Sequence, residues 1–416
     1  MTASNSSLPL IAQLARHLQR PVPESVRTKA RLHLLDWLAC VAGARGSAVA
    51  TAINRRNALH GLPATRWLGN VLEMDDVHRT GRLHPGPVIW PIALEEAVDE
   101  GCNFDTMLAG AAQGYEAMIA VGATFDDYHY SFYHPTSTAG PFGSAATAAW
   151  ITGLTEEQFA WALGNAGSDT GGLWQMRHES VMTKQWHTAM AAGAGAFASF
   201  VAQVGVTGPQ SILEGPQGLY AAMTRNPKPM VFTDHWRIEE VSFKPWAACR
   251  HAHPAIDCAL ELRAAGKLTL PVHVETYADA ITFCDNASPA TEIEAKFSLQ
   301  HAVAVIASGG NATPADFTSS RIAELTGLRA QVTVAEHPEF TARYPDHFGA
   351  RIGDVTLVDT RGDPERPMTE ANIIAKLRTL VAWGGLADAE ADRAIELALH
   401  GDDAGAIVAM LEEWLS

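Results

Sequence analysis

The feature that most constrains the fold of this chain is a change in its hydrophobic period near residues 225–240. Before this point, apolar side chains recur every three or four residues, as on one face of a helix. The helices predicted from this spacing cover residues 24–43, 88–100, 104–123, 139–153, 156–165 and 187–204. After it, apolar and polar residues alternate, which is typical of β-strands. The strands predicted from this alternation cover residues 271–283, 329–336 and 350–359.

Helices are also predicted between the strands, near 251–265, 298–308 and 315–326, and a helical tail follows from 369 to the end. The predicted fold is therefore mainly α, with a large all-α helical domain and a smaller α+β lid domain. The predicted boundaries place the helical domain at 1–228, the lid at 229–368, and C-terminal helices that return to the helical domain at 369–416.

The segment 187–204 differs from the other helices in the small size of its side chains. Gly193 and Gly195 lie in its middle, and each glycine costs a helix about 1 kcal/mol relative to alanine. Close approach of another helix, or of the active-site backbone, would offset that cost. We predict a tightly packed core helix here.

Composition excludes several classes of partner. The net charge is −16, from 46 acidic and 30 basic residues, which disfavours nucleic acid and anionic membrane surfaces. No apolar run reaches the ~18 residues of a membrane span, and the first residues lack a signal pattern. The five cysteines lack C-x-x-C spacing, so neither a disulfide framework nor a cysteine zinc site is predicted. We expect a cytoplasmic protein.

Four segments, 70–85, 133–143, 177–187 and 243–257, concentrate polar residues where a core would be apolar. Each has a structural alternative, since Asp, Ser and Thr at helix ends often serve only as caps. His251 and His253 resemble a pair of metal ligands, but no third ligand has matching spacing, so no metal site is predicted. The absence of Gly-x-Gly-x-x-Gly and Walker-type loops predicts no nucleotide cofactor.

These segments, taken in order, resemble the MmgE/PrpD family, which includes 2-methylcitrate dehydratase, cis-aconitate decarboxylase and iminodisuccinate epimerase. The resemblance covers nearly the whole chain. Its motifs are 34–43 (LLDWLACVAG), Met74-Asp75-Asp76 to His84-Pro85, His134-Pro135-Thr136 to Phe142-Gly143, Thr183-Lys184 to His187, Phe243-Lys244-Pro245 and 296–300 (KFSLQ). It implies a helical domain, a smaller α+β lid and a homodimer.

The resemblance also implies which positions form the site. The predicted catalytic residues are Asp76, His84, His134, Lys184, Lys244 and His301. The predicted substrate-binding residues are Arg82, Arg177, Arg250, Thr136 and Ser137. Lysine and arginine suit the carboxylates of a small polycarboxylate, and histidine suits proton transfer at neutral pH.

Within this set, His84 and His134 are predicted to be the acid and base. Each precedes a proline, which takes the chain out of helix and places the histidine at a helix entrance. Asp76 is predicted to orient His84, because a base usually needs a third group to fix its tautomer.

The predicted function is that of a cofactor-independent lyase of the dehydratase kind, which removes a proton next to a carboxylate. Two alternatives from the same family are an epimerase of a substituted succinate, such as iminodisuccinate, and a cis-aconitate-type decarboxylase. The epimerase is favoured by departures from the family pattern, among them Val77, where many members have threonine, and His301, where dehydratase and decarboxylase members tend to have tyrosine. A helical binding or scaffold protein is the non-enzyme alternative. A serine hydrolase is disfavoured because no Gly-x-Ser-x-Gly motif is present.

Overall fold

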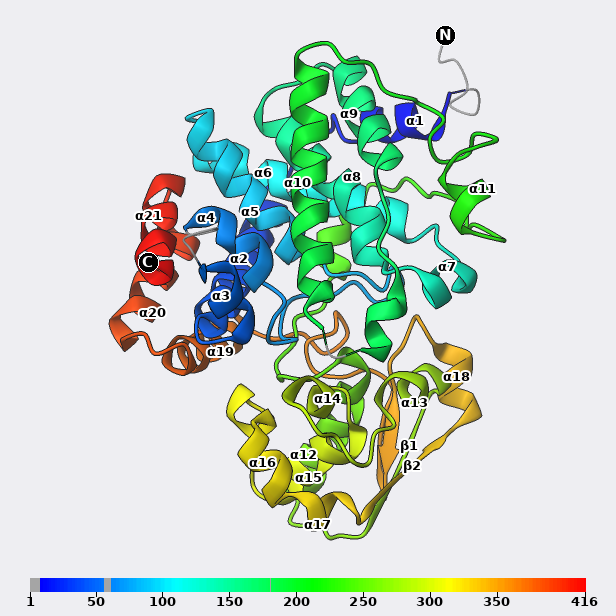
Figure 1. The fold of residues 1–416 in the computed structure, drawn as a ribbon, viewed down its shortest axis with the longest axis vertical. Helices are drawn as coiled ribbons and strands as arrows, with labels where there is room; N and C mark the ends of the chain where they lie inside the picture. The colour runs from blue at the N-terminus through cyan, green and yellow to red at the C-terminus, as the bar shows by residue number, and fades with distance from the viewer. Residues whose placement is uncertain (1–7, 56–60, 180) are drawn as a thin grey trace. The chain divides into compact units, whose positions relative to one another are not determined.

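A computed structural model describes residues 8–55, 61–179 and 181–416 of the chain. They form two compact units. The first consists of the described residues up to Val71 together with Asp76–Val241 and Gly384–Ser416, and the second of Leu72–Asp75 and Ser242–Trp383. The predicted fold class is confirmed, since the protein is mainly helical and has one small mixed sheet in its C-terminal half (Figure 1). The three-segment division at 228 and 368 remains a prediction.

In the part that the structure describes, the regular elements of the first unit are helices, beside two isolated β-bridges, His78–Leu83 and Tyr133–Leu173. Its helices are α1 (Leu10–His17), α2 (Glu24–Ala44), α3 (Ala48–Ile53), α4 (Leu62–Leu68), α5 (Gly86–Asp99), α6 (Phe104–Gly122), α7 (Asp127–Phe132), α8 (Pro135–Ile151), α9 (Glu156–Ser168), η3 (Trp174–His178), α10 (Thr183–Gln203), α11 (Leu219–Met223), η4 (Arg237–Glu240), α20 (Asp388–Ile395), η7 (Glu396–His400) and α21 (Ala404–Leu415). Among the described helices, none has an apolar stretch of the length that a bilayer crossing requires.

Helix α8 lies at the centre of this unit, where it packs on α6, α9 and α10 (Figure 1). Glycine allows the closest of these approaches. A Cβ at Gly195 of α10 would lie 2.3 Å from the carbonyl oxygen of Pro141 in α8, and one at Gly140 of α8 would lie 2.8 Å from Cβ of Ala191. The tight packing predicted for 187–204 is therefore confirmed on this face. The opposite face of α10 is exposed, so the expectation of a core helix is wrong for that side.

The second unit surrounds a four-stranded sheet with the order β2-β1-β3-β4. Its strands are β1 (Val272–Thr276), β2 (Val332–Glu336), β3 (Ala350–Ile352) and β4 (Val355–Leu357). Its helices are η5 (Arg250–Ala252), α12 (His253–Ala264), α13 (Ala278–Cys284), α14 (Glu292–Lys296), α15 (Leu299–Ala307), η6 (Pro314–Phe317), α16 (Ser319–Glu324), α17 (Thr326–Arg329), α18 (Pro338–Arg343) and α19 (Glu370–Trp383). β1 pairs parallel to β2 and antiparallel to β3, with Val274 opposite both Val334 and Ile352.

Two of the predicted strands are shorter than expected. The segment 271–283 is extended only to Thr276, because the buried side chains that follow, Tyr277, Ala280 and Cys284, recur at helical spacing and form one face of α13. The segment 350–359 is a hairpin rather than one strand. Gly353, with a φ of 58°, turns the chain between β3 and β4.

Candidate functional site

A pocket of about 590 Å³ lies in the first unit, against the N-terminal turns of α8 and α10. The loop 169–173 and helix η3 complete its wall. Two of the polar segments singled out in the sequence meet here, because Ser137 comes from one and Thr183 and His187 from the other. Its further lining residues include Gly172, Gln175, Glu179, Trp186 and Met190.

His187, which lines this pocket, contacts the buried ring of His134. Their Nδ1 atoms lie 3.2 Å apart, and both side chains are buried. One nitrogen must carry the hydrogen and the other must accept it, so the two rings adopt opposite tautomers. One ring then has a bare Nε2 and the other an Nε2–H. Burial lowers the pKa of His187, which favours its neutral form at pH 7.

The backbone around His134 holds this pair in place. The His134 N–H donates to the carbonyl of Gly172 over 2.8 Å, and the His134 ring packs on Trp174 with 4.5 Å between ring centroids. Gly172 has a φ of 97°, and a Cβ there would lie 2.4 Å from Cβ of Ser137. Only glycine therefore fits where the loop approaches the start of α8.

The backbone of His84 contacts the start of α8. Its N–H donates to Oγ1 of Thr136 over 3.1 Å, so the ends of two predicted site segments, 52 residues apart, are in contact. Thr136 is fully buried and serves here as an acceptor for that loop. Its predicted role in substrate binding remains a prediction, as does the acid–base pairing of His84 with His134.

The carboxylate of Asp76 is engaged with groups other than the His84 ring. Its Oδ2 lies 2.8 Å from Nδ1 of His33 and accepts from the hydroxyl of Tyr115 over 2.6 Å. Its Oδ1 accepts from the N–H of Gly86 over 2.8 Å, at the first residue of α5. These contacts join α2, α5 and α6, and they give Asp76 a structural role whether or not it also acts on His84.

The cationic side chains predicted in the first unit differ in their surroundings. Arg82 is buried, donates to Asp127 over 2.9 Å and lies over the ring of Tyr130. Arg177, in η3, is half-buried over the ring of Trp174. Lys184 is buried in α10 and lies three residues before His187, so both share one face of the helix.

Lys244, in the second unit, is fully buried. Its Nζ lies 3.1 Å from Oδ1 of Asp75 and 3.8 Å from Oε2 of Glu73, and both carboxylates are buried as well. Glu73 has a φ of 58°, a strained conformation for a residue with a side chain. Lys244 is thus part of a buried ion cluster, and its predicted contact with substrate remains a prediction.

The other two predicted residues of this unit, Arg250 and His301, also contact other residues of the chain. Arg250 forms an ion pair with Asp363, which accepts from Ser242 over 2.7 Å as well. His301 lies with Nε2 at 2.9 Å from the carbonyl of Asp316 and Nδ1 at 3.4 Å from a nitrogen of Arg329. Their roles toward substrate remain predictions.

His301 predicts a pH dependence of stability. Burial lowers its pKa from 6.5 to about 4 in the folded protein. As pH falls from 6.5 towards 4, the unfolded chain therefore takes up a proton that the folded chain does not, and stability is lost. The expected loss is on the order of 3 kcal/mol, at ~1.4 kcal/mol per pKa unit. The free energy of unfolding, measured with urea at a series of pH values across this range, should fall less steeply for His301→Gln than for the wild type. Parallel curves would contradict the assignment.

Among the described residues, one group has the composition and proximity of a metal site. Ligand atoms of His347, Asp359 and Glu365 all lie within 4.8 Å of one another, and His347 Nδ1 lies 2.7 Å from Oδ1 of Asp359. His251 and His253 do not point to a shared ligand. His251 Nδ1 lies 2.8 Å from the hydroxyl of Tyr277, and the other ring bonds to a backbone carbonyl.

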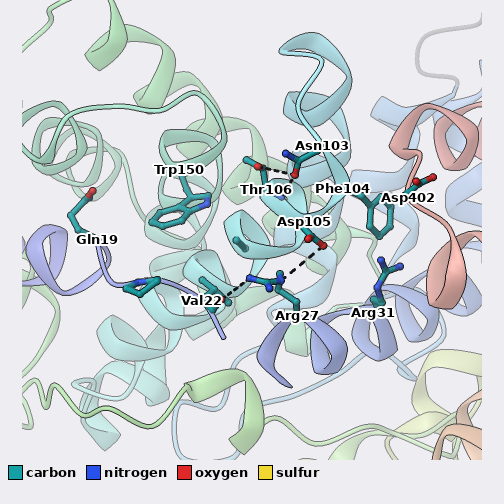
Figure 2. A pocket seen from close by; sticks show the side chains of 12 residues that line it. Gln19, Val22, Arg27, Arg31, Asn103, Phe104, Asp105, Thr106, Trp150 and Asp402 are labelled. Carbon is teal, nitrogen blue, oxygen red and sulfur yellow. Dashed lines mark hydrogen bonds and ion pairs between the residues drawn. The ribbon is translucent and has the colours of Figure 1, made fainter. Parts of the chain in front are cut away.

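A second pocket in the first unit, of about 670 Å³, contains none of the predicted site residues (Figure 2). Its two arginines are already engaged. Arg27 donates to the carbonyl of Val22 and to Glu24, and Arg31 donates to two backbone carbonyls and lies over the ring of Phe104. We therefore place the candidate site in the pocket beside His187.

Sequence reasoning missed two features of this region. His187 was quoted within a motif but not predicted as a site residue, although its position three residues after Lys184 was a usable signal. His33 and Tyr115, the partners of Asp76, lie in ordinary helical segments, and no pattern in the sequence marks them.

Comparison with known proteins bears on both units. The sequence matches the MmgE/PrpD N-terminal domain over residues 67–231 and the MmgE/PrpD C-terminal domain over residues 246–401. It is 28% identical to the cis-aconitate decarboxylase of Homo sapiens over 251 residues, which cover 56% of this chain and 52% of that protein. For the cis-aconitate decarboxylase of Mus musculus the identity is 27% over 252 residues, 57% of this chain and 51% of that protein. The match thus spans about half the length of these relatives.

Proposed function

Because the chain belongs to the MmgE/PrpD family, we propose that it is a cofactor-independent lyase of the dehydratase kind, acting on a small di- or tricarboxylate. Family membership confirms the resemblance found in the sequence. The reaction and the substrate are our proposal, and it is carried by the contact between His134 and His187.

The opposite tautomers of the two rings supply what a dehydration needs. A bare Nε2 removes the proton from the carbon next to a carboxylate, and the electron pair left on that carbon forms the new double bond. The bond from the neighbouring carbon to its hydroxyl breaks. The ring that took the proton is now an imidazolium and passes its Nδ1 hydrogen across the contact to the other ring, whose Nε2 hydrogen protonates the departing hydroxide to give water. A positioned acid–base group contributes about 10²–10⁴-fold to such a step.

Lys184 is proposed to hold a substrate carboxylate beside this pair. It shares a helix face with His187, and negative charge builds up on the carboxylate as the proton leaves. Ser137, on the pocket wall, is a neutral donor for a second oxygen of the substrate.

Decarboxylation is the second candidate, because both curated relatives carry the name cis-aconitate decarboxylase. Proton NMR in heavy water, with a panel of hydroxylated and unsaturated polycarboxylates, separates the outcomes. A new alkene signal together with loss of the hydroxylated substrate supports dehydration, and release of carbon dioxide supports decarboxylation. Deuterium gain without a new product would identify an epimerase, and no change with any compound would overturn the proposal.

We also propose that the reaction needs no metal ion. Prolonged treatment with EDTA followed by dialysis is expected to leave the turnover number unchanged, because the proposed proton transfers use only imidazole groups. A loss of activity that one divalent cation restores would contradict this expectation. It would direct attention to His347, Asp359 and Glu365, and the variant Glu365→Gln would then test that group.

The family resemblance implies a homodimer, and we propose that assembly here.

A further inference from the structure

Three side chains of the second unit bring possible ligand atoms for a metal ion together. They are the imidazole of His347 and the carboxylates of Asp359 and Glu365, and we call them the 347–365 triad. One ligand atom of each lies within 4.8 Å of those of the other two. None of the three is among the residues proposed for the reaction, and all of them belong to one compact unit. An ion held here would therefore be bound by that unit alone.

The β3–β4 hairpin positions the first two side chains of the triad. Its strands pair antiparallel, with Ala350 opposite Leu357. His347 lies three residues before Ala350, and Asp359 lies two residues after Leu357. Both therefore stand at the open end of the hairpin, where the two chain segments are still neighbours. There Nδ1 of His347 lies 2.7 Å from Oδ1 of Asp359.

A tight turn after β4 brings Glu365 back to this end of the hairpin. The N–H of Asp363 donates to the carbonyl of Thr360 over 3.1 Å, and the Thr360 N–H donates to the Asp363 carboxylate over 3.0 Å. Gly362, at the bend, has a φ of 99°, and a Cβ there would clash with the carbonyl oxygen of Phe243. Only glycine therefore fits at this bend, which directs the chain towards Glu365.

A buried carboxylate on α12 holds the same turn from the other side. Oδ2 of Asp257 accepts from the N–H of Arg361 over 2.8 Å and lies 3.1 Å from a guanidinium nitrogen of Arg366. Arg366 also donates to Glu261 over 2.8 Å and to the carbonyl of Asp359 over 3.2 Å. The backbone that carries the two carboxylates of the triad is thus fixed by contacts of its own. Ligands on a fixed backbone lose little conformational freedom when an ion binds.

The spacing of the triad suits a small divalent ion. Zinc lies about 2.0–2.2 Å from imidazole nitrogen and carboxylate oxygen, so two tetrahedral ligands lie roughly 3.4 Å apart. This separation is within the 4.8 Å that the triad shows. The 2.7 Å between His347 and Asp359 would widen by roughly 0.7 Å if both of these atoms bound the ion. A side-chain rotation can supply this change, because the His347 ring is 38% exposed.

The combination of one imidazole and two carboxylates indicates the class of ion. Imidazole suits zinc, copper, iron and nickel, whereas calcium and magnesium take oxygen ligands. Two carboxylates balance the charge of a divalent cation, which also relieves the repulsion between them. Since Glu365 is exposed, water can complete the coordination.

We propose that the 347–365 triad binds a divalent transition-metal ion of the zinc class. The ion ties the segment before β3 to the turn after β4 and stabilises the second unit, because the unfolded chain does not hold these ligands together. Its role is structural, and the proposed reaction does not use it. The proposal is therefore independent of the proposed function.

Isothermal titration calorimetry with zinc chloride tests this site on the full chain, after treatment with EDTA and dialysis. The wild type is expected to bind one zinc ion per chain with a saturable heat. His347→Gln and Glu365→Gln should each bind zinc at least tenfold more weakly, since loss of an outer-shell partner alone weakens metal sites by about 10–100-fold. A wild type without saturable binding, or wild-type affinity in either variant, would overturn the proposal.

The matched control is His235→Gln. His235 also lies beside two carboxylates, 3.1 Å from Glu239 and 3.6 Å from Glu240, but it contacts them through different ring nitrogens. One imidazole cannot turn both nitrogens to one ion, so this variant should bind zinc like the wild type. If it loses as much affinity as His347→Gln, zinc binds surface histidines in general and the proposal fails. Calcium chloride should give no saturable heat, and calcium affinity equal to that for zinc would contradict the role of His347.

Thermal unfolding, followed by circular dichroism, tests whether the ion stabilises the fold. Free zinc at ten times its dissociation constant should raise the melting temperature of the wild type by about 3 °C. It should not raise that of His347→Gln or Glu365→Gln. Without zinc these variants should melt close to the wild type, because both side chains are at least partly exposed. Zinc binding without a rise in the wild type would refute the stabilising role. Absence of the proposed reaction would leave this inference unchanged.

Discussion

Replacing His187 by asparagine is expected to lower the turnover number by about 10²–10⁴-fold, the range of one positioned acid–base group. Asparagine keeps a polar side chain in the pocket but cannot exchange a proton at neutral pH. The partner change, His134→Gln, should cause a loss of similar size, because His187 then lacks the ring that fixes its tautomer. The turnover number is measured on the substrate that the NMR panel identifies.

The matched control is His178→Asn, an exposed histidine at the end of η3, which should retain wild-type turnover. A readout that does not depend on activity is the long-range proton–nitrogen NMR spectrum of the imidazoles. It should show one ring of the pair with hydrogen on Nδ1 and the other with hydrogen on Nε2. Wild-type turnover in both His187→Asn and His134→Gln would remove the pair from the mechanism.

Replacing Lys244 by methionine is expected to lower the free energy of unfolding by about 3–5 kcal/mol, the usual cost of removing one partner from a buried ion cluster. Methionine fills much of the same volume, so the main effect is electrostatic. Asp75 and Glu73 would remain buried without the ammonium group of Lys244. Urea unfolding, followed by circular dichroism, measures the change.

Two further variants show whether burial causes this loss. Lys267→Met removes an ion pair of shorter distance, 2.6 Å to Asp354, but both of those side chains are exposed, so no measurable change is expected. Lys244→Met combined with Asp75→Asn should be more stable than Lys244→Met alone, because one of the two buried negative charges that Lys244 offset is removed. If Lys244→Met unfolds like the wild type, the cluster does not stabilise the protein, and a role for Lys244 toward substrate gains weight.

Local patterns predicted the helices well because their spacing depends only on neighbouring residues. The cap of α9 is such a local feature, since Thr155 accepts from the N–H of Gln158, three residues further on. The strand at 271–283 was too long, because alternation and helical spacing are hard to separate over the few residues after Tyr277.

Long-range pairings could not be predicted in this way. Asp76 contacts His33 and Tyr115, which lie 43 and 39 residues away in the sequence. A local sequence pattern cannot predict a contact across such a separation. For Lys244 the sequence indicated a cation among apolar residues but not the carboxylates that surround it. For α10 the apolar period was correct, but a period cannot tell whether a face packs on its own chain or remains exposed.

The carboxylate of Asp76 has a consequence for the opening of the helical unit. Its two oxygens hold the first amide of α5, a ring from α2 and a hydroxyl from α6, so the acceptor of this amide is itself fixed by two other helices. The Gly86 amide should therefore exchange its hydrogen only as fast as the whole unit unfolds, although it lies at a helix end where amides ordinarily exchange quickly. The exchange rate of this one amide therefore reports cooperative unfolding of the unit, at a position two residues after His84 in the sequence.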